Sequence, residues 1–195
     1  MKFTDKITAA IEDNIFTKQN LFQQKTIELI EEIGFKLSKT IENGGKILFC
    51  GNGGSAADSQ HLAAELVVRL RSYFQRPAIP AIALTVDTSI LTAGGNDFGF
   101  DYVFSRQVEA LGTNKDALIA ISTSGNSPNV IKAIEEAQKK NMLIVGFIGG
   151  DGGKIKEMCN LSFISPSSNT ARIQETHILV GHILCEIIEE TLFPS

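Results

Sequence analysis

Apolar residues recur at helical spacing in the first part of the chain. Over residues 1–43 they return every three or four positions, weakly at first and clearly from Phe22 to Ile41, so we expect helices there. The pair Gly44-Gly45 then indicates a helix end. An amphipathic helix ahead of the first strand either covers the domain's own sheet or packs on another subunit, and the pattern leaves both uses open.

From residue 46 onward the apolar residues gather into short continuous runs separated by helical stretches. The runs are 46–50, 79–86, 117–122, 143–148 and 161–164. We expect helices at 56–70, 103–111, 128–141, 154–158 and 171–192. Continuous runs are typical of strands buried on both faces, and strands that alternate with helices predict an α/β fold with a parallel sheet. Ligands of such sheets bind at the carboxyl ends of the strands.

Length and composition favour one globular domain. The chain has 195 residues, of which 43% are hydrophobic and 21% are charged, and its formal net charge is −4. We interpret 1–195 as a single domain, in which helices 1–43 serve packing or oligomerisation and 44–195 form the α/β core with a closing helix. The negative charge argues against a nucleic acid or an anionic membrane as a partner.

Cysteine usage and the N-terminal segment predict a cytoplasmic protein. The three cysteines have no CxxC spacing, which favours free thiols in a reducing compartment. The first residues contain acids and lack the apolar stretch of a signal peptide. The longest apolar runs, about eight residues, are too short to span a bilayer.

The stretch 50–69, CGNGGSAADSQHLAAELVVR, carries the first chemical signal. Its glycine turn lets a ligand approach the backbone closely. We expect Ser55 to cap the following helix, with Asp58 completing a capping box, and the helix start to offer N–H groups to an anion or hydroxyl. The glycines also fit a loose dinucleotide pattern, but the nearest acid after the second strand, Asp87, is too far along the chain. A nucleotide-dependent oxidoreductase is therefore disfavoured.

His61 and Glu65 are four residues apart on this predicted helix, so they share one face. Such a pair binds a divalent metal or moves protons, and it is also a common surface pair. The neighbouring residues are apolar, and a carboxylate in a buried helix needs a partner. These observations favour a functional pair over a surface one.

A loop rich in hydroxyl groups, 122–127 (STSGNS), follows the third predicted strand. Ser127 and Pro128 predict the N-cap and first residue of a helix. Hydroxyl groups at a helix start suit a phosphate, and the Walker lysine is missing, so a sugar phosphate fits better than a nucleoside triphosphate. The alternative is an ordinary serine-rich turn.

Two further polar groups are ambiguous by themselves. Asn96 and Asp97, after the second strand, either hydrogen-bond sugar hydroxyls or only form a turn. In the last helix Gln174 and His182 are eight residues apart, roughly 12 Å along the axis, which is a strained span for two ligands of one small ion. If both serve one type of site, we expect them to come from different subunits. His177 is interpreted as a structural or surface histidine.

Four stretches together resemble the sugar isomerase (SIS) family and, within it, the phosphoheptose isomerases. They are CGNGGSAADSQHLAAEL, GGNDFGFDYVFSRQVEALG, ISTSGNSPNV and ARIQETHILVGHIL. The resemblance implies a doubly wound, mainly five-stranded parallel sheet with an N-terminal helical extension. It also implies an isomerase that converts sedoheptulose 7-phosphate to D-glycero-D-manno-heptose 7-phosphate through an enediol, the first step towards the heptoses of lipopolysaccharide and other bacterial surface polysaccharides.

The resemblance further implies roles for single residues. Glu65 would be the general base and His182 the acid or proton shuttle. The zinc ligands of the family match His61, Glu65, Gln174 and His182. Its substrate-binding residues match Asn52, Gly53, Gly54, Ser55, Asn96, Asp97, Ser122, Thr123, Ser124, Ser127 and Gln174. Family members are homotetramers with active sites at subunit interfaces, and some carry an aspartate where this chain has Ala171.

A function of another class is a non-catalytic SIS module that binds the bacterial replication initiator as a tetramer. The chain ending 191–194 (TLFP) resembles such a protein. A binding module needs neither a base nor a set of metal ligands. The presence of His61, Glu65 and His182 together with Gln174 therefore favours the enzyme.

Overall fold

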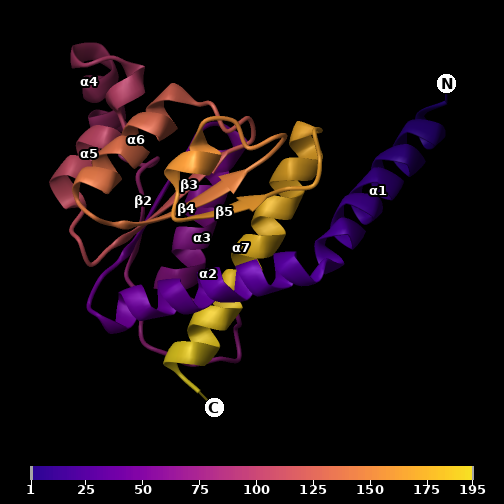
Figure 1. Ribbon diagram of the computed structural model, residues 1–195, viewed down its shortest axis with the longest axis horizontal. Helices are drawn as coiled ribbons and strands as arrows, with labels where there is room; N and C mark the ends of the chain where they lie inside the picture. Colours follow the sequence, from indigo (N-terminus) through magenta and orange to yellow (C-terminus); the bar gives the residue numbers. More distant parts are fainter. Residues whose placement is uncertain (1, 195) are drawn as a thin grey trace.

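The structure is a computed structural model that describes residues 2–194. Met1 and Ser195, the ends of the predicted domain, lie outside the described residues. Five parallel strands form one sheet with helices on both faces (Figure 1). The strands are β1 (Ile47–Gly51), β2 (Ala81–Ala83), β3 (Ala117–Ser122), β4 (Leu143–Ile148) and β5 (Leu161–Ile164), in the order β2-β1-β3-β4-β5. The predicted α/β class with a five-stranded parallel sheet is confirmed.

Helices α2, α3 and α7 cover one face of the sheet, and α5 and α6 cover the other. The α-helices are α1 (Phe3–Gln19), α2 (Gln24–Glu42), α3 (Gly54–Val67), α4 (Thr88–Asp97), α5 (Ser105–Leu111), α6 (Pro128–Lys139) and α7 (Thr170–Leu192). Short 3₁₀ helices are η1 (Asn20–Phe22), η2 (Phe100–Tyr102) and η3 (Ile155–Met158). Within residues 2–194, no helix has both the length and the apolar character that crossing a membrane requires.

Strand β1 supplies both layers of the core, because successive residues of a strand point to opposite faces. Ile47 and Phe49 pack with α2, α3 and α7, whereas Leu48 and Cys50 pack with α5 and α6. All four are at most 2% exposed. Burial on both faces explains why the apolar runs in the sequence are continuous.

Three elements differ from those predicted. The run 79–86 gives only the short strand β2, because β2 lies at the sheet edge and pairs with β1 alone. Residues 88–97 form α4, which the sequence pattern does not predict; the carboxylate of Asp87 caps it by accepting the Ile90 N–H at 2.9 Å. The helix expected at 154–158 is the 3₁₀ helix η3.

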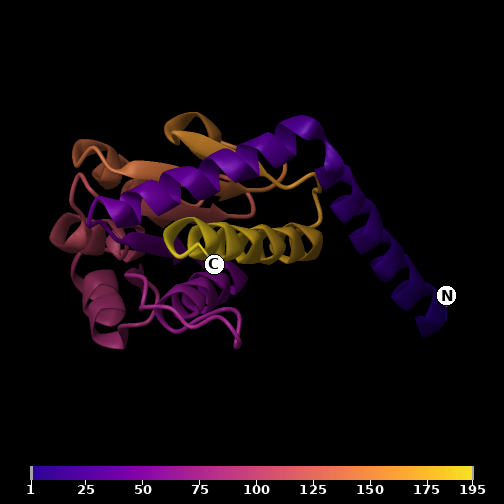
Figure 2. The same ribbon diagram turned by 90° about the horizontal axis from the view of Figure 1, so that it is seen from below.

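Helix α1 extends away from the body of the molecule (Figures 1 and 2). Its residues Ile7, Ile11 and Ile15 are more than half exposed. In contrast, α2 buries Ile33 and Leu37 completely against the core. The two uses expected of the N-terminal helices are thus divided. Helix α2 covers the domain's own core, whereas α1 presents an apolar stripe (Ile7, Ile11 and Ile15) that the described part of the chain leaves largely open.

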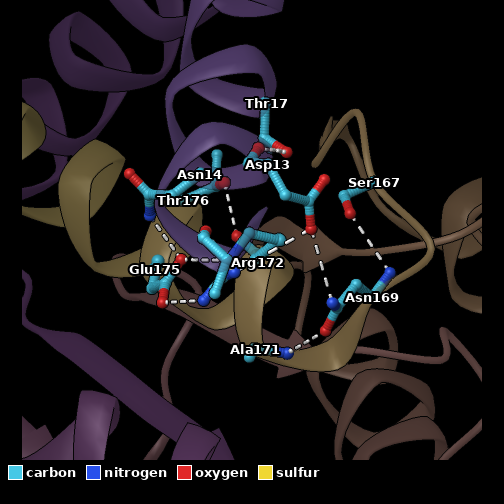
Figure 3. A network of polar contacts seen from close by, with 10 residues as sticks. Asp13, Asn14, Thr17, Ser167, Asn169, Ala171, Arg172, Glu175 and Thr176 are labelled. Atoms are coloured by element: carbon cyan, nitrogen blue, oxygen red, sulfur yellow. Dashed lines mark hydrogen bonds and ion pairs between the residues drawn. The ribbon is translucent and has the colours of Figure 1, made fainter. Parts of the chain in front are cut away.

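A polar network ties α1 to the beginning of α7 (Figure 3). Arg172 donates to a backbone carbonyl of α1 at 2.8 Å and also binds Glu175, which accepts a hydrogen bond from Asn14. The Asn169 side chain caps α7 by accepting the N–H of Ala171 at 3.0 Å. Ala171 itself is exposed and contributes no polar side chain to this network.

Candidate active site

The strand order reverses between β1 and β3, which is where ligands of doubly wound sheets bind. Asn52 follows β1, and Asn129 lies in the first turn of α6 after β3. Their side-chain amides exchange two hydrogen bonds of 2.8 Å, and Asn129 is 2% exposed. The amide pair therefore holds the two loops together at the switch point. Asn129 is not predictable as a site residue from the sequence, where its signal is its place directly after the hydroxyl-rich loop.

Gly53, and not Ser55, is the N-cap of α3. The φ angle of Gly53 is +55°, a conformation that favours glycine, so the helix begins earlier than the cap pattern predicts. Ser55 lies buried in the first turn. The predicted capping box is therefore wrong. Asp58 has a buried carboxylate oxygen with no hydrogen-bond partner among the described residues, and burial raises its pKa to about 6, against a smaller lowering by His61.

The hydroxyl-rich loop is a compact turn that packs against the loop after β4. Ser127 and Pro128 take the predicted N-cap and first helical positions of α6, but the Ser127 hydroxyl lies 2.9 Å from that of Ser122 and makes no cap bond. Gly125 has a φ of +65° and lies against the carbonyl of Gly152, which a Cβ would approach to 2.1 Å. The loop after β4 thus fixes the shape of the predicted phosphate loop.

Helices α3 and α7 run side by side in parallel and approach each other closely. A Cβ on Gly54 of α3 would lie 2.2 Å from the Gln174 amide nitrogen. Further along, a Cβ on Gly181 of α7 would lie 2.6 Å from the Leu62 side chain. Glycine at both points lets the two backbones come together. We call this contact, from Gly54 and Gln174 onward, the α3–α7 seam.

Three candidate residues meet at the seam. His61 Nε2 lies 2.8 Å from His182 Nε2 and 3.3 Å from Glu65 Oε1. One ligand atom from each of the three residues lies within 4.8 Å of the others. The His61 side chain is 49% exposed and that of Glu65 is 17% exposed, so the cluster is open to solvent. The predicted common face of His61 and Glu65 is confirmed, and His182 joins them from the same chain.

The other predicted residues lie apart from this cluster. Gln174 packs against Gly54 at the beginning of the seam, and its separation from His182 along α7 keeps the two apart within one chain. Asn96 and Asp97 lie in the last turn of α4, where both are exposed and the Asn96 amide donates to Asp97 at 2.7 Å. In the described chain they make no hydrogen bond or ion pair with the other candidate residues.

Known proteins similar to this chain share both its fold and its sequence. Residues 12–149 match the SIS domain family. The phosphoheptose isomerase of Aneurinibacillus thermoaerophilus is 48% identical over 97% of this chain and 95% of its own. The chain belongs to the phosphoheptose isomerase family.

Two solved structures of that family superpose closely. The phosphoheptose isomerase of Neisseria gonorrhoeae has a TM-score of 0.90 at 43% identity, and that of Francisella tularensis has 0.93 at 39%; each match covers 97% of this chain and 100% of the other. The expected SIS-type architecture is confirmed. The relatives are named as isomerases, so the non-catalytic binding module is not favoured.

Proposed function

We propose that this chain isomerises the ketose sedoheptulose 7-phosphate to the aldose D-glycero-D-manno-heptose 7-phosphate. A relative that is 48% identical over nearly the whole chain is a phosphoheptose isomerase. The structural observation that carries the proposal is the convergence of the Glu65 carboxylate with the imidazoles of His61 and His182 at the α3–α7 seam. A pure binding module has no need of this convergence.

The reaction removes a proton from C1 of the ketose, passes through a cis-enediol and returns a proton to C2. One base placed over both carbons serves both transfers, and Glu65 is the carboxylate available for this at the seam. A second group must assist proton movement between O1 and O2. His182 suits this role, because its Nε2 lies within hydrogen-bond distance of a second imidazole, His61, that can accept or supply the proton.

We propose that the loop 122–127 binds the substrate phosphate. Ser124 is exposed there, and the backbone N–H groups at the start of α6 lie beside it. The sugar hydroxyls would then lie near Asn52, Gly53 and Gly54, at the switch point of the sheet. Asn96 and Asp97 would complete the sugar contacts from the exposed end of α4.

We also propose that the cluster binds zinc. Two imidazoles and a carboxylate are a usual donor set of catalytic zinc sites, and the donor atoms of His61, Glu65 and His182 are close enough to share one ion. Gln174, the fourth expected ligand, does not belong to this cluster within one chain. When bound, zinc stabilises negative charge on oxygen. Because coordination lowers the basicity of a carboxylate, we propose that zinc orders the site or leaves during turnover.

We propose a homotetramer with active sites at its interfaces. The apolar stripe of α1 supports this proposal, because large exposed apolar areas mark protein contacts. A second supporting feature is a groove of about 540 Å³ between α2 and α7, with a lining that includes Ile27, Phe35, Ile183 and Ile187.

A cytoplasmic location and a role in bacterial surface-polysaccharide synthesis complete the proposal. The three cysteines are free, and burial raises their thiol pKa values to about 12.

An assay with the purified protein tests function and metal separately. Sedoheptulose 7-phosphate is added before and after treatment with a chelator, and aldose formation is followed by NMR. We expect the aldose to form, and the rate to fall on chelation and return with zinc. Absence of turnover under all conditions would contradict the isomerase. Unchanged turnover after complete metal removal would contradict an essential zinc ion.

A further inference from the structure

A buried network of charges lies at the far end of the α3–α7 seam. The Glu189 carboxylate on α7 accepts from Arg76 Nε at 2.8 Å and from Arg71 Nε at 3.1 Å. The side chains of Glu189 and Arg76 are both 0% exposed. Burying such charges is costly, and apolar residues of similar volume are often as stabilising. A contribution to stability alone therefore does not explain why these charges are buried here.

Arg76 also reaches the helix that carries the proposed base. Its Nη2 donates to the backbone carbonyl of Glu65 at 2.7 Å, while its Nη1 donates to the carbonyl of Pro77 at 2.9 Å. Glu65 lies in the last turn of α3, where carbonyls have no partner within the helix, and a cation there interacts favourably with the helix dipole. One guanidinium thus links the backbone of Glu65 to the side chain of Glu189.

The spacing on α7 relates this network to the proposed acid. Glu189 follows His182 by about two helical turns, so both residues point from the same side of α7 towards α3. Beyond the Gln174–Gly54 contact, helix α7 is therefore linked to α3 through His182 and through Glu189. His182 meets His61 directly, and Glu189 is joined to the Glu65 backbone through Arg76. Both links act, with the packing of Leu62 on Gly181, on where Glu65 lies relative to His182.

The neighbouring arginine holds the segment that carries Arg76. Arg71 Nη1 binds Glu190 at 2.7 Å, and the Arg71 guanidinium lies 4.6 Å from the centre of the Phe74 ring. The backbone N–H of Leu70 also donates to Glu189, at 3.4 Å. The chain after α3 is thereby folded around Glu189, which keeps the Arg76 guanidinium in one position.

We propose that Arg76 and Glu189 are positioning residues for the isomerase, which fix α3 against α7 so that Glu65 and His182 act on the same substrate. This inference rests on the proposed function. Neither residue belongs to the cluster of Glu65, His61 and His182. They act through the backbone of Glu65, and a displacement of about 1 Å in such a group is enough to lower a rate about 100-fold. A lysine cannot replace Arg76, because Arg76 contacts Glu189, Pro77 and Glu65 through three separate nitrogens of one planar group, whereas lysine has a single nitrogen.

Two variants and a matched control test the proposal kinetically. Glu189→Gln removes the negative charge with little change of shape. Arg76→Lys keeps the positive charge but loses the planar guanidinium with its separate donor nitrogens. The control is Asp116→Asn, because Asp116 is a 2% exposed carboxylate that pairs with Lys46 at the opposite end of the sheet. We expect the two seam variants to lower kcat about 10- to 100-fold with KM within about threefold, and the control to retain kcat within about twofold. Retained kcat in both seam variants, or an equal loss in the control, would overturn the proposal.

Nitrogen NMR of the imidazole rings reads the same positioning without any turnover. The chain has three histidines, and His177 is buried against the carbonyl of Ile148, so its signal serves as an internal reference for the folded state. We expect Glu189→Gln and Arg76→Lys to shift the signals of His61 and His182 while that of His177 stays. Unchanged His61 and His182 signals in both variants would contradict the proposal. If the wild-type protein shows no isomerase activity, the proposed function fails, and this spectrum still decides whether the network positions the cluster.

Discussion

Two carboxylates at different places in the molecule have very different surroundings. At the amino ends of the strands, Asp116 accepts hydrogen bonds of 2.7–2.9 Å from the backbone and side chain of Lys46 and from the backbone and hydroxyl of Thr113. Burial by itself raises the pKa of this carboxyl, but the bonds from Lys46 and Thr113 outweigh it and lower the pKa. At the α3–α7 seam, Glu65 has one ion-pair contact among the described residues, His61 at 3.3 Å.

The difference separates a structural carboxylate from an available one. Asp116 accepts four hydrogen bonds within the protein and is 2% exposed, so this group joins the segments that begin β1 and β3 and is closed to a ligand. Glu65 retains free lone pairs beside an imidazole that is half exposed. A carboxylate of this kind can take a proton from a substrate or bind a metal. The same contrast divides α7, where His177 is enclosed and His182 faces the cluster.

The largest expected effect is on Glu65. Glu65→Gln removes the base and keeps the shape, so we expect kcat to fall on the order of 10³-fold while the substrate still binds. The matched control is Glu186→Gln, an exposed carboxylate on α7, which should leave kcat unchanged. Steady-state kinetics and a binding titration measure both effects. Near-normal turnover of the Glu65 variant would contradict the catalytic role that distinguishes Glu65 from Asp116.

Asp116→Asn should lower stability and leave turnover almost unchanged. We expect the free energy of unfolding at pH 7 to fall by about 2 kcal/mol, because hydrogen bonds to a buried charged group are lost, while kcat stays within about twofold. Denaturant unfolding measures the first quantity. Glu42→Gln, which removes an exposed ion pair with Lys39, should change stability by less than about 0.5 kcal/mol. A stable Asp116 variant with impaired turnover would contradict the structural role.

Burial of His177 should make a smaller contribution to stability, and this contribution depends on pH. It is 1% exposed, its Nε2 lies 3.0 Å from the Ile148 carbonyl, and it packs between Phe147 and Phe163. Burial lowers its pKa to about 4, and the bond to Ile148 opposes this only in part. The unfolded chain, with an ordinary histidine pKa of about 6.5, therefore binds the proton first as the pH falls.

Stability held by neutral His177 is thus present above about pH 6.5 and is lost progressively towards pH 4. Between about pH 6.5 and pH 5, we expect the free energy of unfolding of the wild type to fall by about 1.5 kcal/mol more than that of His177→Phe. The phenylalanine keeps an aromatic ring between Phe147 and Phe163. Denaturant unfolding at several pH values measures this difference. Parallel stability profiles for the two proteins would show that His177 is not held neutral.

Local sequence patterns predict most of the sheet but not all of its surroundings. The strands at 117–122, 143–148 and 161–164 are confirmed at those bounds, because their burial on both faces leaves a continuous apolar record. Helix α4 escapes prediction because Gly94 and Gly95 weaken its helical pattern. The cap at Ser55 is wrong because Gly53, with its positive φ, begins the helix earlier.

The candidate site is predictable only as far as its contacts are local. The spacing of His61 and Glu65 by itself predicts a shared face, whereas only the family resemblance predicts that His182 joins them. Arg76 and Glu189 have no such signal, because their pairing joins segments far apart in the chain and forms only when α3 and α7 pack together. The charges of both residues look like ordinary surface charges in the sequence.

Proton transfer at the seam can be followed directly by running the isomerisation of sedoheptulose 7-phosphate in heavy water with the wild-type protein. Removal of the C1 proton by Glu65 and return of a proton to C2 through an enediol predicts aldose product whose C2 carries solvent deuterium to the extent that the protonated carboxyl exchanges with solvent before the return, and NMR detects both the aldose and its deuterium. Glu65→Gln should form almost no such product in the same time. Equal aldose formation by wild type and the Glu65 variant, whatever the deuterium content at C2, would contradict proton transfer by this residue.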